Sequence, residues 1–172
     1  MMRELRPRGE AHLPGGRVRV KPVPDGVDDW THPYHGPDNN PLSTDRRIRA
    51  PYLTQFLAGP RYGPAPQASV AAGGRVFKAY GNVAWHEREE AYLNTLVAHD
   101  GYNGTILWER KLPSGLMVHR NTFVATPELI YVGDDASCKR YDAATGRLVD
   151  EIRPSVELAR GTFWKWMALE EG

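Results

Sequence analysis

The stretch from Phe123 to Arg153 reads FVATPELIYVGDDASCKRYDAATGRLVDEIR and decides the fold class of this chain. A short apolar run begins at Val124, and Leu129-Ile130-Tyr131-Val132 is rich in residues that favour strands. Residues 138–141 and 147–152 can form two further strands. Short segments of this kind, separated by turn residues, predict a small antiparallel sheet.

The turns in this stretch carry their own signals. Gly133-Asp134-Asp135 separates the second and third predicted strands, and Asp142-Ala143-Ala144-Thr145-Gly146 separates the third from the fourth. In the second turn the Asp carboxylate can accept backbone hydrogen bonds, and the glycine can take the positive φ of a type I turn with a bulge. Four strands joined by tight turns within about thirty residues are the size of one β-propeller blade.

A second copy of the pattern lies in residues 67–112, upstream of this blade. Laid over residues 121–152, it matches in four places, with one insertion covering 83–94. The matched pairs are Val70-Ala71-Ala72 with Val124-Ala125-Thr126, Val76-Phe77 with Ile130-Tyr131, His99-Asp100 with Tyr141-Asp142, and Asn103-Gly104 with Thr145-Gly146. A spacing of roughly 42 residues between turns suits a four-stranded blade.

The repeat predicts an all-β chain: a partial β-propeller of four-stranded antiparallel blades with a proline-rich, irregular N-terminal arm. Eleven of the 14 prolines precede Gln67. The expected segments are a basic Pro/Gly-rich arm (1–29), a lead-in loop region (30–66), blade 1 (67–115), blade 2 (116–156) and the start of a third blade (157–172). In the last segment Met167-Ala168-Leu169 takes the place of Val124-Ala125-Thr126. Two further strand candidates are Arg17–Val20, as an edge strand, and Tyr52–Leu57.

Composition limits the classes of function. The net charge of +1 gives no overall attraction to nucleic acid, so no nucleic-acid partner is expected. No apolar run approaches the roughly 18 residues of a membrane helix, so no membrane span is expected either. The opening residues lack the apolar core of a secretory signal, which places the chain as given in the cytoplasm. Cys138 is the only cysteine and is expected to pack in a strand.

The second repeat, Ser137-Cys138-Lys139-Arg140-Tyr141-Asp142-Ala143-Ala144-Thr145-Gly146-Arg147-Leu148, resembles the repeat of pyrroloquinoline-quinone-type, or quinoprotein-like, β-propellers. Residues 99–108 match the same pattern, and the family's blade-docking Trp falls on Trp108. The resemblance implies that Trp108 packs between adjacent blades, and that Asp150 stands at the equivalent place in the second repeat. Residues 30–40 look like the lead-in of some bacterial propellers of this kind, which implies a periplasmic location if the chain is incomplete at its N-terminus.

The leading interpretation is a quinoprotein-like propeller segment that acts as a binding or scaffold module and carries no catalytic residues or cofactor of its own. Because a blade buries its faces against its neighbours, the expected partners are further propeller blades or another copy of the chain. The alternative is a fragment of a quinone- or metal-dependent oxidoreductase, with pyrroloquinoline quinone and calcium, whose site is completed by missing blades. A third hypothesis gives the basic arm an acidic partner.

Two groups of residues are candidate sites. The segments that enter innermost strands converge at the channel mouth of a propeller, which suggests a positive rim for an anionic ligand with tryptophans as stacking surfaces. The rim candidates are Arg61, His119, Arg120, Lys165 and Trp164 or Trp166. His32 and His35 are the candidate metal ligands, but Pro33 and Gly36-Pro37 exclude a helix that would place both imidazoles on one face.

Overall fold

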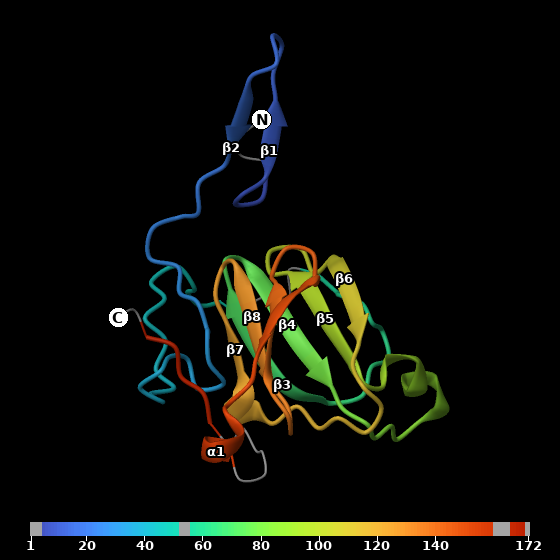
Figure 1. Cartoon of the computed structure of the whole chain (residues 1–172). Helices are drawn as coiled ribbons and strands as arrows, with labels where there is room; N and C mark the ends of the chain where they lie inside the picture. Colours follow the sequence, from blue (N-terminus) through green and yellow to red (C-terminus); the bar gives the residue numbers. More distant parts are fainter. Residues whose placement is uncertain (1–4, 52–55, 160–165, 171–172) are drawn as a thin grey trace.

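The computed structural model describes residues 5–51, 56–159 and 166–170, and it confirms the all-β prediction (Figure 1). Sheet 1 consists of β3 (Pro66–Ala72), β4 (Arg75–Tyr80), β5 (Thr95–Asp100) and β6 (Ile106–Lys111), hydrogen-bonded in that order. Sheet 2 consists of β7 (Phe123–Ala125), β8 (Leu129–Gly133), β9 (Cys138–Asp142) and β10 (Leu148–Ile152), also in sequence order. All neighbouring strands are antiparallel.

The two sheets share one register over the residues that are paired in both, and sheet 1 has a further register shift between Pro66 and Ala68. Val70 lies opposite Phe77 in sheet 1, as Val124 lies opposite Tyr131 in sheet 2. Both sheets have a β-bulge in the last strand pair, between Ala98 and His99 in sheet 1 and between Leu148 and Asp150 in sheet 2. After the bulge, Ala98 faces Trp108, and Arg140 faces Asp150. The sequence repeat is therefore a structural repeat, and Asp150 does stand at the place of Trp108.

The core lies between the sheets, because each of them turns one apolar face toward the other. Phe77, Leu96, Phe123 and Ile130 are fully buried there, and Trp108 packs against the edge of the cluster. The first strands of the sheets, β3 and β7, also contact each other. The alternation of apolar residues along these strands thus selects the faces that meet.

Trp30 and Thr31 pair with the free edges of both first strands. Trp30 exchanges two backbone hydrogen bonds with Ala71 of β3, with N···O distances of 2.7 and 2.6 Å. The carbonyl of Thr31 accepts from the backbone N–H of Ala125 in β7 at 2.9 Å. The lead-in region therefore joins the sheets at their first strands.

The C-terminal residues return to the same place. After the short helix α1 (Val156–Ala159), the backbone N–H of Met167 donates to Asn121 O at 2.8 Å. Figure 1 shows this segment beside the lead-in loops, on one side of the body. Residues 166–170 form no strand, so the expected opening strand of a third blade is not formed there, and residues 160–165 lie outside the described part.

The N-terminal arm is less irregular than the proline content predicts. The expected edge strand is β2 (Val18–Val20), which pairs with β1 (Glu10–His12) in a hairpin that projects from the body (Figure 1). The turn contains Gly15 and Gly16, both at positive φ. The sequence analysis does not predict β1, because three residues are too short a run for their polar–apolar–polar alternation to be recognised. Of the other strand candidate, residues 52–55 lie outside the described part, and Phe56 and Leu57 are in no strand.

The insertion at residues 83–94 is an excursion between β4 and β5 that contains the 3₁₀ helix η1 (Glu87–Tyr92). A second 3₁₀ turn, η2 (Arg120–Thr122), leads into β7. No helix in the described part of the chain is long and apolar enough to cross a membrane.

Candidate functional site

The contact between sheet 1 and the last turn of sheet 2 is built on Trp108. Its indole Nε1 donates to the carbonyl of Ala143 at 3.1 Å. The ring lies so close to Gly146 that a Cβ there would be 2.6 Å from Trp108 Cε3. Two residues further along β6, Arg110 donates to the carbonyl of Gly146 at 3.0 Å, and its guanidinium lies 4.9 Å from the centre of the Tyr141 ring. Trp108 and Arg110 of β6 thus bind the turn between β9 and β10.

That turn has the predicted chemistry. The Oδ1 atom of Asp142 accepts from the backbone N–H of Ala144 at 3.1 Å and of Thr145 at 2.8 Å, and from the Thr145 hydroxyl at 2.7 Å. The hydrogen bond from the Thr145 hydroxyl, with those from the backbone, holds the pKa of the Asp142 carboxyl below its usual value. Gly146 has φ +69°, which a residue with a side chain rarely adopts. The turn is a rigid surface for the indole.

At the equivalent turn of sheet 1, the residues that pack on the turn come from the lead-in region and not from a strand. Asp100 accepts from the backbone of Tyr102 at 2.9 Å and of Asn103 at 3.2 Å, as Asp142 does in sheet 2. A Cβ on Gly104 would lie 2.7 Å from atoms of both Phe56 and Ala58. Phe56 therefore takes the place at this turn that Trp108 takes at the other. No local pattern predicts this contact, because Phe56 is separated from the turn by more than forty residues.

A neighbouring contact fixes the same segment. The ring Nε2 of His99 lies 2.7 Å from the carbonyl of Gly59. The Asp100 carboxylate, almost fully buried, pairs with the Arg6 guanidinium at 2.5 Å. Part of the basic arm is therefore bound to the first turn.

The last strand of sheet 2 makes a different contact. Asp150 accepts from Arg140 through both of its oxygens, with Nε to Oδ1 at 2.6 Å, and this pairing lowers the pKa of the Asp150 carboxyl. Inward from this pair, Val124, Tyr131, Cys138 and Ile152 line a hollow of about 370 Å³ together with residues 166–169. Burial raises the pKa of the Cys138 thiol to about 11, which fits its expected packing role. We call this side of sheet 2 the open face.

The histidines proposed as metal ligands have other partners. His32 is buried, its Nδ1 lies 2.8 Å from the Thr31 hydroxyl, and its Nε2 accepts from the backbone N–H of Leu169 at 3.1 Å. Burial lowers the pKa of the His32 imidazole. His35 Nε2 lies 2.8 Å from Asp28 Oδ2. Within residues 5–51, 56–159 and 166–170, no group of three or more His, Cys, Asp or Glu side chains could hold a metal ion.

The rim candidates are brought together only in part. His119 and Arg120 lie at the start of η2, where His119 Nδ1 accepts from Asn121 N at 3.2 Å and Arg120 lies 5.6 Å from the centre of the Tyr34 ring. Arg61 lies over Tyr62, whose ring Arg88 of η1 also contacts. Trp166 lines the hollow of the open face. Trp164 and Lys165 lie outside the described residues.

Comparison with models of known protein families and with curated proteins finds no match to this chain.

Proposed function

We propose that this chain is a scaffold segment of a quinoprotein-like β-propeller, which binds protein surfaces and converts no substrate itself. The observation that carries the proposal is the insertion of Trp108 against the Asp142–Gly146 turn, which joins two sheets of identical register. The resemblance of the repeat implies this type of contact between neighbouring blades. An indole with both an apolar contact and a satisfied N–H is a strong anchor between packed surfaces.

The placement of the lead-in favours a scaffold over an oxidoreductase. In a propeller the first strand of each blade lies next to the central channel, where the quinone and calcium of the alternative interpretation would bind. Here, Trp30 and Thr31 hydrogen-bond to the edges of β3 and β7. The imidazoles of His32 and His35 beside them are already held by Thr31, Leu169 and Asp28.

The proposed binding surface is the open face, and its occupant is a further four-stranded blade. Register makes this face equivalent to the side of sheet 1 that packs on sheet 2, with Val124 and Tyr131 in the places of Val70 and Phe77. Its outer part differs, because the Arg140–Asp150 pair replaces Ala98 and Trp108. Val124 is only 2% exposed and lines a hollow together with residues 166–169, so the partner meets the more exposed Ile152 beside the charged outer part.

In the absence of other partners, the open faces of two copies are expected to pair. Sedimentation analysis of the purified chain should then show association that depends on concentration, and Ile152→Glu should weaken it, because Ile152 lies on this face and is 43% exposed. Leu107→Glu is the matched control, since Leu107 lies on the last strand of sheet 1 and is 39% exposed. A monomer at all concentrations, or an equal effect of the two variants, would contradict this surface.

The choice between scaffold and oxidoreductase is tested by thermal unfolding with pyrroloquinoline quinone, with and without calcium. A scaffold predicts no calcium-dependent rise in the melting temperature. A saturable rise that requires both quinone and calcium would favour the oxidoreductase, because a ligand that binds only the folded state stabilises it.

A further inference from the structure

A large cleft lies between the base of the N-terminal arm, the lead-in loops and the β3–β4 turn. Its volume is about 1070 Å³, which is ample for a small organic ligand. Most of its lining is apolar or aromatic, with four arginines and three aspartates among the apolar residues. The residues used below are Arg8, Arg47, Arg49, Arg75, Phe56 and Tyr102.

The arginines of the cleft are not in direct contact with its carboxylates. Arg75 donates to the carbonyl of Pro127 at 3.3 Å, and Arg47 donates to that of Asp25 at 2.6 Å, so both bind neutral acceptors. Arg8 and Arg49 have no side-chain hydrogen bond to the described residues. None of the four forms an ion pair with an Asp or Glu in the described part of the chain.

The aspartates of the cleft are bound by other donors. Asp28 Oδ2 accepts from His35, from the Ser43 hydroxyl and from the backbone of Thr44. Both oxygens of Asp29 lie 3.1 Å from the backbone N–H of Gly73. Asp45 Oδ1 accepts from the backbone N–H groups of Arg47 and Ile48. These contacts fix the loops around the cleft and leave the guanidinium groups available to a ligand.

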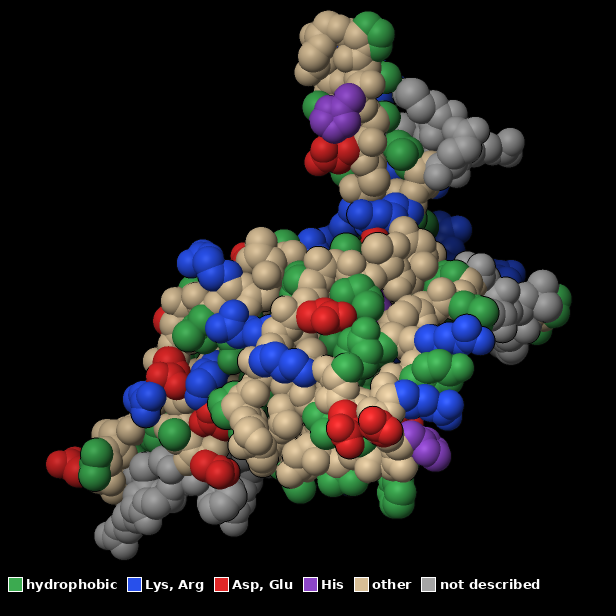
Figure 2. Space-filling model, turned by 90° about the vertical axis from the view of Figure 1, so that its right-hand side faces the viewer, with side chains coloured by type: hydrophobic (Ala, Val, Ile, Leu, Met, Phe, Trp, Pro, Cys, Tyr) green, Lys and Arg blue, Asp and Glu red, His purple; other side chains and the backbone are tan. Residues whose placement is uncertain are grey.

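Among the cleft arginines, Arg75 would be stabilised most by a bound anion. It is half-buried at the β3–β4 turn, and burial together with the positive charge of Arg8 lowers its pKa. Arg6 also lies nearby but is paired with Asp100, and the carboxylates of Asp142 and Asp100 act on the pKa of Arg75 in the opposite direction. Figure 2 shows Lys and Arg side chains gathered where the hairpin meets the body. Guanidinium groups bind carboxylate and phosphate through paired hydrogen bonds, which are stronger than neutral ones.

We propose that this cleft binds a small organic dianion, with its phosphate or carboxylate groups on Arg8, Arg49 and Arg75. The body of the ligand is apolar or aromatic and packs against Phe56, Tyr102 and the aliphatic lining. This site is separate from the open face of sheet 2 and does not depend on the scaffold function. It also differs from the predicted rim, because none of the rim candidates lines it.

The test is isothermal titration of the full chain at constant ionic strength with three probes: phenyl phosphate, phthalate and inorganic phosphate. The first two are aromatic dianions that carry phosphate and carboxylate, and the third lacks the apolar body. We expect one or both aromatic dianions to bind at a single site and more tightly than inorganic phosphate. Whichever of the two binds tighter identifies the anionic group of the ligand.

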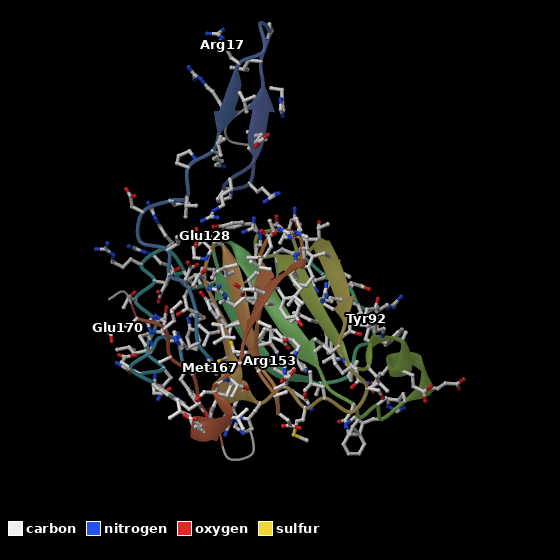
Figure 3. The ribbon with its side chains drawn as sticks, in the orientation of Figure 1. Arg17, Tyr92, Glu128, Arg153, Met167 and Glu170 are labelled. Carbon is white, nitrogen blue, oxygen red and sulfur yellow. The ribbon has the colours of Figure 1, made fainter. Side chains whose placement is uncertain are left out.

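Arg75→Gln should weaken this binding by about tenfold or more, because a hydrogen bond to a charged group is lost. Arg49→Gln is a second variant, since Arg49 is exposed and has no hydrogen bond whose loss would disturb folding. Arg17→Gln is the control, because Arg17 lies at the far end of the hairpin (Figure 3). The proposal is overturned if neither dianion binds more tightly than inorganic phosphate, or if Arg49→Gln and Arg17→Gln give the same affinity as the wild type. Quinone binding at this cleft would need no calcium, which separates it from the quinone site tested above.

Discussion

The last strands of the two sheets, β6 and β10, occupy equivalent places but make different contacts. Trp108 of β6 reaches across to the next sheet, where it donates to Ala143 and covers Gly146. Asp150 of β10 instead pairs with Arg140 of its own sheet. The backbones share register and bulge, so the difference lies in a single pair of facing residues. One backbone pattern thus yields an anchored surface in sheet 1 and a partly charged one in sheet 2.

The two equivalent turns, residues 100–104 and 142–146, also have the same backbone features and different contacts. Each has an Asp that accepts backbone hydrogen bonds and a glycine at positive φ. The Gly146 turn receives an indole from a strand, whereas the Gly104 turn receives Phe56 from a loop. A turn of this kind therefore accepts an aromatic side chain from either type of segment. The first turn is closed by the chain's own lead-in, and the open face lies at the other end of the stack.

The largest expected effect comes from Trp108→Ala, which removes the anchor between the sheets. We expect the free energy of unfolding to fall by about 4 kcal/mol, as for other large aromatic side chains packed against a core. Urea unfolding measures this loss. Trp85→Ala is the control, because Trp85 is 80% exposed, and its effect should stay within about 0.5 kcal/mol. Equal effects of the two substitutions would refute the anchoring role of Trp108.

The loss of stability caused by an alanine substitution at each turn glycine should increase with the rigidity of the side chain that the glycine contacts. Gly146→Ala forces a Cβ into the anchored indole and should cost about 3 kcal/mol, from backbone strain and overpacking together. Gly104→Ala should cost about 2 kcal/mol, because Phe56 and Ala58 lie in an exposed segment outside any strand, which can move aside.

Gly115→Ala serves as the reference for both turn variants. Gly115 has φ +79° and nothing within 4 Å of a built Cβ, so this substitution reports the backbone strain alone, about 1 kcal/mol. Urea unfolding of the three variants gives the ranking. The rigidity argument fails if Gly104→Ala costs as much as Gly146→Ala.

The smallest expected effect is a pH dependence confined to sheet 2. Hydrogen bonds from Ser137, Lys139 and Arg153 lower the pKa of the Glu151 carboxyl from 4.5 to about 2. A folded-state pKa below the unfolded one gives stability that is present above the unfolded pKa and is lost as the pH falls toward the folded pKa. Glu151→Gln should therefore make the loss of stability between about pH 5 and pH 2 less steep.

Unfolding free energies measured across this pH range test the effect. Glu109→Gln is the matched control, because Glu109 stands at the equivalent place on β6 and forms no ion pair within the described residues. An unchanged pH slope in Glu151→Gln, or the same change in Glu109→Gln, would contradict the assignment to sheet 2.

Much of the fold is predictable because its signals are local. The Asp142–Gly146 turn, the strands around it and the equivalence of Asp150 with Trp108 follow from residue types at short spacing. The contact of Phe56 with Gly104 and the bond from Leu169 to His32 join residues far apart in the sequence, and neither has a local pattern. The same holds for the cleft, whose arginines come from the arm, the lead-in and a strand.

Residue types at short spacing suffice to predict a repeat of four-stranded antiparallel sheets, since alternation of apolar residues and turn chemistry act within a few residues. The segments that pack on each turn and pair with each strand edge are known only from the folded chain. Trp30 and Thr31 bind the first strands, and Phe56 takes the place of a tryptophan at the first turn. A docked side chain is selected by its shape and by unsatisfied polar groups close to it in space, so the segment that supplies it can come from anywhere in the chain.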